Sequence, residues 1–166
     1  MRIYVLYGVL AWAAVILQSS VLSVLFPSPY IPDLVFLLVL YSAITQSLWT
    51  GVFCAFLCGY FIGVFSGSPV SLWILVYIVS FFLARPVSKW FSPDSRVLHA
   101  GYPFVFTFVK SLLLLIAIRV FSREMAPFPW VIQGALGEAI VNSAIAFFIF
   151  PALKYSERTP RASFEW

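Results

Sequence analysis

The fold of this chain is constrained most by six apolar stretches, most of them about as long as a membrane-crossing helix. They run from about 3 to 26, 33 to 46, 48 to 65, 71 to 87, 102 to 121 and 130 to 153. About 20 helical residues cross a hydrocarbon core roughly 30 Å thick. Because the apolar residues are continuous rather than alternating, the stretches predict helices and not the strands of an outer-membrane barrel.

The composition agrees with an integral membrane protein. Hydrophobic residues make up 63% of the chain and charged residues only 10%, whereas soluble domains carry roughly 25% charge. No stretch is long and polar enough to form a separate soluble domain. We therefore expect an all-α membrane protein of about six transmembrane helices, with one polytopic domain over residues 1–153 and a short polar cytoplasmic tail over 154–166.

The second stretch is short, and its ends carry the clearest local signals. Pro32 and Asp33 suit the first turn of a helix, because proline needs no amide partner there and an aspartate caps exposed backbone donors. We expect this stretch to span the membrane, with a re-entrant pair formed with the third stretch as the alternative. Ser68 and Pro69 predict the turn between the third and fourth stretches.

Asp33 is expected at the outer membrane surface, at the start of the second helix. The simplest role for it there is a helix cap. A functional alternative is an ion pair with Arg119 or Arg123, which the same topology places outside.

Basic residues outside the apolar stretches predict the orientation. With six spans and a cytoplasmic N-terminus, one side of the membrane holds most of them: Arg2, Arg85, Lys89, Arg96, Lys154, Arg158 and Arg161. This asymmetry predicts that both termini are cytoplasmic. The segment from 85 to 101 is expected to lie on the membrane surface. Scattered bases of this kind form a poor phosphate track, so nucleic acid is not an expected partner.

Small residues recur at strict four-residue spacing in the third stretch. They are Gly51, Ala55, Gly59, Gly63 and Gly67. This spacing places small residues on one face of a helix, where two backbones can approach closely in lipid. The face predicts tight helix packing, either within this chain or against a partner protein.

Two charged residues lie inside predicted spans, where charge is costly and often functional. Lys110 and Glu138 fall at depths that a lysine side chain can bridge, and Asn142 lies one helical turn from Glu138. The favoured interpretation is an ion pair that joins the fifth and sixth helices, with Asn142 sharing the hydrogen bonding. A partner helix that docks on this polar seam is the alternative.

Candidate groups for chemistry are few. One histidine and two cysteines leave little material for a metal site, and Cys54 and Cys58 are most simply small apolar packing residues. Common catalytic motifs for proteases, hydrolases and phosphate binding are missing from the sequence. We therefore expect no enzymatic activity, no metal and no cofactor.

Three short motifs together resemble one bacterial family. They are Leu17-Gln18-Ser19-Ser20, Ile31-Pro32-Asp33-Leu34, and the run from Gly59 to Pro69. In order and spacing they are similar to the MreD family of rod shape-determining proteins, over roughly the first half of the chain. The second half agrees in length and hydropathy.

The resemblance implies a fold similar to the substrate-binding subunits of energy-coupling-factor transporters. It also implies a non-catalytic scaffold in the bacterial inner membrane that binds MreC. Through MreC, such a protein supports the link from MreB to RodA and a penicillin-binding transpeptidase during peptidoglycan synthesis. The alternative is a solute-binding subunit of a transporter with the related fold. The Ala-x-x-x-Ala docking motif that many such subunits carry on the first helix is missing here.

Overall fold

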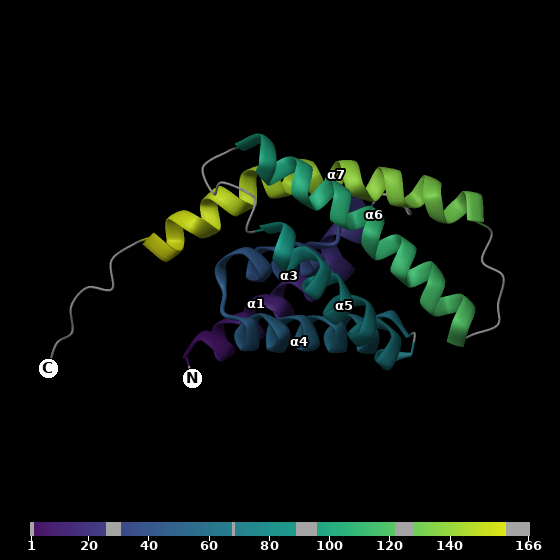
Figure 1. Cartoon of the computed structure of the whole chain (residues 1–166), viewed down its shortest axis with the longest axis horizontal. Coiled ribbons are helices and arrows are strands. Elements are labelled where there is room, and N and C mark those ends of the chain that lie inside the picture. The colour runs from purple at the N-terminus through teal and green to yellow at the C-terminus, as the bar shows by residue number, and fades with distance from the viewer. Residues whose placement is uncertain (1, 26–30, 68, 89–95, 122–127, 159–166) are drawn as a thin grey trace, which may run out of the picture.

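The computed structural model describes residues 2–25, 31–67, 69–88, 96–121 and 128–158, and these residues form helices joined by short connections. Figure 1 shows the arrangement. In chain order the elements are α1 (Arg2–Ile16), η1 (Leu17–Leu22), α2 (Ser23–Leu25), α3 (Leu34–Thr45), α4 (Leu48–Ser66), α5 (Val70–Ser88), α6 (Arg96–Phe121) and α7 (Phe128–Arg158). The all-α prediction is confirmed for the described residues.

Five segments are long and apolar enough to cross a membrane. They are Tyr7–Leu25, Leu48–Ser66, Val70–Val87, Ala100–Phe121 and Gln133–Leu153. Large apolar side chains on several of them face outward, among them Trp49, Val120 and Phe148, which are 79%, 68% and 72% exposed. Because lipid and not water suits such a surface, the chain is a multi-pass membrane protein.

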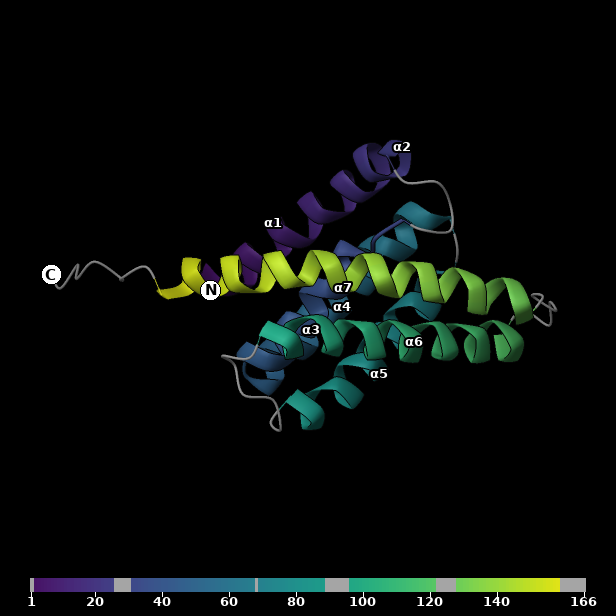
Figure 2. The ribbon, with the colours of Figure 1, turned by 90° about the horizontal axis from the view of Figure 1, so that it is seen from above.

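The helices run back and forth along one axis. Successive helices from α1 to α7, the short α3 among them, run in alternating directions (Figures 1 and 2). The start of α1 and the end of α7 therefore lie at the same end of the bundle. In both views α6 and α7 lie side by side, and α7 crosses over α3.

The second apolar stretch, which was expected to span the membrane, forms a helix shorter than a membrane span. Helix α3 has 12 residues, which reach only about 18 Å at 1.5 Å per residue. Helix α4, by contrast, is long and apolar enough to span by itself, unlike a member of a re-entrant pair. The count of about six spans therefore becomes five long helices and one short helix.

The short helix α3 forms the core of the bundle. It contacts α1, α4, α5 and α7, and nearly all of its side chains from Val35 to Ala43 are buried. A helix that is apolar on every face is stable only where other elements surround it. The apolar composition that suggested a lipid-facing span instead fits a helix enclosed by protein.

The ends of α3 are defined by polar contacts. Asp33 is its N-cap, and the carboxylate accepts a hydrogen bond of 2.9 Å from the backbone N–H of Phe36. Pro32 is fully buried directly before the cap. At the other end Gln46 is extended, and its carbonyl accepts a hydrogen bond of 3.0 Å from the guanidinium of Arg85. The predicted cap at Asp33 is thus present.

Several predicted boundaries shift. Helix α5 continues to Ser88 and α6 begins at Arg96, so both ends of the expected surface segment belong to long helices, and its middle lies outside the described residues. Helix α7 continues to Arg158, past the expected end of the membrane domain. The apolar residues predicted which segments are long enough to cross the membrane. The helices themselves are longer, because the backbone hydrogen bonding of a helix can continue past its apolar segment.

Helices α4 and α5 form a tight hairpin. Gly67 ends α4 in the left-handed conformation at φ 66°, which glycine adopts without steric cost. The carbonyl of Pro69 then accepts a hydrogen bond of 3.0 Å from the N–H of Leu72. The predicted turn is present at Gly67 and Pro69, whereas Ser68 lies outside the described residues.

The small residues of α4 face α5. A Cβ atom at Gly59 would lie 2.7 Å from Cα of Ile74, and one at Gly63 would lie 2.6 Å from Cα of Val70. A Cβ atom at Gly51 would overlap the ring of Phe81.

The other two positions of the stripe differ. Ala55 is fully buried, whereas Gly67 has no neighbour at this distance and serves as the helix cap. The stripe therefore packs two helices of this chain together, which was the first of its two interpretations.

We expect Gly59→Ala to destabilise the protein although alanine has the higher helix propensity. The gain in propensity is about 1 kcal/mol, but the added methyl group meets backbone atoms that cannot rotate away, and overpacking of this kind costs about 1–3 kcal/mol. Thermal unfolding in mild detergent should show a lower midpoint. Gly101→Ala is the matched control, since its Cβ atom meets nothing within 4 Å. Equal midpoints for the two variants would contradict the close approach of α4 and α5.

Candidate functional site

Asp33 lies in the middle of the helix bundle with hydrogen bonds to both carboxylate oxygens. Oδ1 accepts the capping bond from the N–H of Phe36 at 2.9 Å. Oδ2 accepts bonds from the hydroxyl of Tyr77 at 2.8 Å and the ammonium of Lys110 at 2.7 Å. The side chain is only 7% exposed. Three donors, one of them charged, compensate the carboxylate for the water it has lost.

Lys110 is placed at the centre of the span Ala100–Phe121 and is 4% exposed. Its ammonium group forms ion pairs with both Asp33 and Glu138. The same nitrogen lies 5.2 Å from the ring centroid of Phe36, a distance at which the ring face attracts a cation. One buried ammonium group therefore has two carboxyl groups and an aromatic ring around it.

Asn142 connects the carboxyl groups to the backbone. Its Oδ1 accepts a hydrogen bond of 2.8 Å from the backbone N–H of Asp33, and its amide nitrogen donates to Thr107 at 3.2 Å and to Glu138 at 3.4 Å. Thr107 in turn donates to the carbonyl of Pro103 at 2.8 Å. The side-chain amide is thus used as both donor and acceptor, as a fully buried amide requires.

We call these six side chains the polar cluster. They come from three helices and the N-cap of a fourth: Asp33 before α3, Tyr77 on α5, Thr107 and Lys110 on α6, and Glu138 and Asn142 on α7. Hydrogen bonds between helices contribute modestly each in a membrane, on average about 0.6 kcal/mol. Their number here fixes the depth and rotation of α3 relative to α5, α6 and α7.

The structure brings together the three residues that the sequence had grouped. Lys110 contacts Glu138, and Asn142 shares the hydrogen bonding from one turn away. The expected surface position of Asp33 is wrong, since it is buried and its ion pair among the described residues is with Lys110 rather than Arg119. Arg123 lies outside the described residues.

A signal for the position of Asp33 was present in the sequence. The second stretch is too short to reach both membrane surfaces. If one of its ends reaches a surface, the cap at the other end has to lie inside the hydrocarbon core. A carboxylate at that depth needs a cation, and Lys110 is the basic residue near the middle of an apolar stretch, whereas Arg85 and Arg119 lie near the ends of theirs.

The two cysteines are packing residues in this structure. Cys54 and Cys58 are free and buried, with their sulfur atoms 3.9 Å apart. Both belong to the hydrophobic core around α3 and α4. No group of three potential metal ligands occurs within the described residues.

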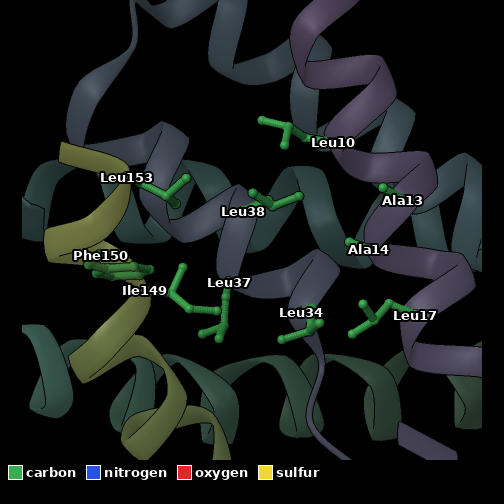
Figure 3. A pocket seen from close by; sticks show the side chains of 10 residues that line it. All are labelled: Leu10, Ala13, Ala14, Leu17, Leu34, Leu37, Leu38, Ile149, Phe150 and Leu153. Carbon is green, nitrogen blue, oxygen red and sulfur yellow. The ribbon is translucent and has the colours of Figure 1, made fainter. Parts of the chain in front are cut away.

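An apolar groove lies between α1 and α7, and α3 forms its floor (Figure 3). Its volume is about 230 Å³. The lining residues are Leu10, Ala13, Ala14, Leu17, Leu34, Leu37, Leu38, Ile149, Phe150 and Leu153. All of these side chains are hydrocarbon, so the groove suits an apolar occupant.

The groove and the polar cluster share one flank of α7. Four residues of α7 follow one another at intervals of four or seven positions, which places them on one face of the helix: Glu138, Asn142, Ile149 and Leu153. Glu138 is the cluster member with the most exposed ionisable side chain, at 17%. Figure 2 shows α1 diverging from α7 toward the end at which α7 begins.

Comparison with known proteins gives no relative. No family model, curated protein or solved structure matches this chain. Function therefore has to be argued from the residues, their contacts and the resemblance of the sequence motifs.

We expect the cluster variants to differ in stability in a defined order. Lys110→Met leaves two buried carboxyl groups without their cation, and loss of one member of a buried ion pair costs about 3–5 kcal/mol. Glu138→Gln keeps a group of the same shape and leaves the ion pair between Lys110 and Asp33 intact, so it should lower the free energy of unfolding by only about 1 kcal/mol. Thermal unfolding in detergent measures both.

Arg119→Met is the control for this series, because it removes a basic residue from the exposed end of the same helix. The double variant Lys110→Met/Glu138→Gln should lose less stability than the two single variants together, since either change alone already breaks the contact between Lys110 and Glu138. Strict additivity, or a midpoint for Lys110→Met equal to that of Arg119→Met, would contradict the energetic role of the cluster.

Proposed function

We propose that this chain is a non-catalytic scaffold of the bacterial cell-elongation complex, in the manner of MreD. In this role it lies in the inner membrane and binds the single-pass protein MreC. Through MreC it supports peptidoglycan synthesis by RodA and a penicillin-binding transpeptidase, coupled to MreB filaments. The motifs around Gln18, Asp33 and Gly63 provide the basis for the family assignment.

The observation that most supports a scaffold is the apolar groove between α1 and α7. Its lining carries no polar side chain, and it lies between two helices whose outer faces meet lipid. Another membrane helix fits such a surface, because van der Waals packing drives helix association in lipid. The alanines at 13 and 14 leave room for the close approach of a second backbone.

The polar cluster supports the same interpretation. A path for a solute or ion needs polar groups that face an open cavity, whereas Asp33, Lys110 and Asn142 are buried and bonded to one another. These bonds hold the four helices in a fixed arrangement. A rigid bundle with an apolar lateral groove is suited to binding a partner helix.

The arrangement of the chain ends is compatible with two cytoplasmic termini. The start of α1 and the end of α7 share one end of the bundle (Figure 1). Arg85 in the last turn of α5 and Arg96 at the start of α6 belong to helix ends on the same side. The excess of Lys and Arg marks the cytoplasmic side. A fold related to the substrate-binding subunits of energy-coupling-factor transporters is part of the same proposal.

The proposal predicts which proteins bind this chain. Affinity purification of the tagged full-length protein in mild detergent should recover MreC together with RodA and the transpeptidase. Recovery of ATPase subunits and a coupling protein instead would favour the solute-binding alternative.

A groove variant makes this test specific. Ala13→Trp places a large ring in the groove, so recovery of MreC should fall several-fold while the amount of folded protein stays the same. Leu112→Trp is the matched control, because Leu112 is a 56% exposed residue of α6 away from the groove. Equal recovery of MreC with both variants would show that the groove is not the binding surface.

A further inference from the structure

The charges of the polar cluster do not balance if every group is ionised. Two carboxyl groups, of Asp33 and Glu138, share the single ammonium group of Lys110. Full ionisation would leave one net negative charge near the middle of the membrane. Net charge at this depth is costly, and buried carboxyl groups that share a site avoid it by holding a proton.

The hydrogen bonds of Asp33 identify it as the ionised member. Its carboxylate accepts three bonds, from the N–H of Phe36, the hydroxyl of Tyr77 and the ammonium of Lys110. An ionised carboxylate is an acceptor only, and each of these donors stabilises that form. Oδ2 already accepts two bonds, and a proton on Oδ1 would weaken the capping bond that it accepts from Phe36.

The hydrogen bonds of Glu138 leave room for a proton. Both of its contacts, from Lys110 and from Asn142 at 3.4 Å, are made to Oε1. Oε2 accepts no hydrogen bond from the described residues. The side chain is 17% exposed, against 5% for Lys110 and 7% for Asp33. Oε2 is therefore the position in the cluster where a proton displaces no bond, and it belongs to the most exposed of the three side chains.

We propose that Glu138 is a proton-binding site within the membrane, and that it carries its proton on Oε2 at neutral pH. The cluster is then neutral as a whole, with one ionised carboxylate, one ammonium group and one carboxylic acid. Oε1 of the acid still accepts the bonds from Lys110 and Asn142. This inference is independent of the proposed scaffold function.

The surrounding titratable groups fit this distribution of charge. Asp33 before α3 and Lys110 on α6 form the charged pair. Tyr77 on α5 donates to Asp33 and so keeps its own proton. On α4 the thiols of Cys54 and Cys58 are buried in the core and lie next to each other. Lys110 is therefore the only cation that the described residues bring to these carboxyl groups.

Infrared spectroscopy of the full-length protein in an alkyl maltoside detergent, which lacks the ester carbonyl groups of phospholipids, tests the proposal, because the C=O stretch of a carboxylic acid is separate from the bands of a carboxylate. The chain has only six acidic residues, so the region is simple. At neutral pH we expect one carboxylic-acid band that shifts in D₂O. Glu138→Gln should remove this band.

Two further variants test the charge balance. In Asp33→Asn, Glu138 becomes the sole counter-charge of Lys110 and should ionise, so the band disappears although Glu138 is still present. In Lys110→Met neither carboxyl group has a cation, and the band should grow to about twice its intensity as both become protonated. Arg119→Met should leave the band unchanged.

The position of the proton is tested by a hydrophobic carbodiimide, which reacts with protonated carboxyl groups that it can reach from lipid. Peptide mass spectrometry after treatment with dicyclohexylcarbodiimide should find the label on Glu138 and not on Asp33. Absence of the carboxylic-acid band in the unmodified protein, its persistence in Glu138→Gln, or a label on Asp33 would each overturn the proposal. Glu138→Gln is expected to fold, since glutamine has the shape of the protonated acid.

Discussion

The ion pair between Asp33 and Lys110 is the interaction on which the rest of the fold depends. It holds the N-terminus of a short helix in the middle of the bundle, where its exposed backbone N–H groups would otherwise lack partners. The same carboxylate caps the helix through the N–H of Phe36 and accepts the ammonium of Lys110. The chain can therefore use a helix of only 12 residues as its core, with longer helices around it.

Two kinds of packing position the helices around this core. Close backbone contact at Gly59 and Gly63 holds α4 against α5, and hydrogen bonds from Asn142 join α7 to α6 and to the cap of α3. Lipid competes with apolar side chains for each helix surface, so close packing and polar bonds provide much of the specificity. The groove lies between α1 and α7.

The groove and the proposed proton site lie on neighbouring parts of α7 and have different roles. Ile149 and Leu153 provide an apolar wall suited to a partner helix, while Glu138 on the same flank, as the proposed carboxylic acid, adds no charge to the buried pair of Asp33 and Lys110. A neutral cluster lets the four helices pack in lipid without a net charge at their junction. The proposed scaffold function needs the groove, whereas the stability of the bundle needs the cluster.

Local patterns in the sequence determined the membrane class, most helix boundaries, the cap at Asp33 and the close-packing face around Gly59, because hydropathy, caps and small-residue spacing act within one helix. The pairing of Lys110 with Glu138 followed from their similar depths. Only the tertiary structure decided that the second helix is an enclosed core element and that Asp33 joins the pair. Those facts depend on which helices surround α3, and contacts between residues far apart in the chain leave no periodic pattern in the sequence.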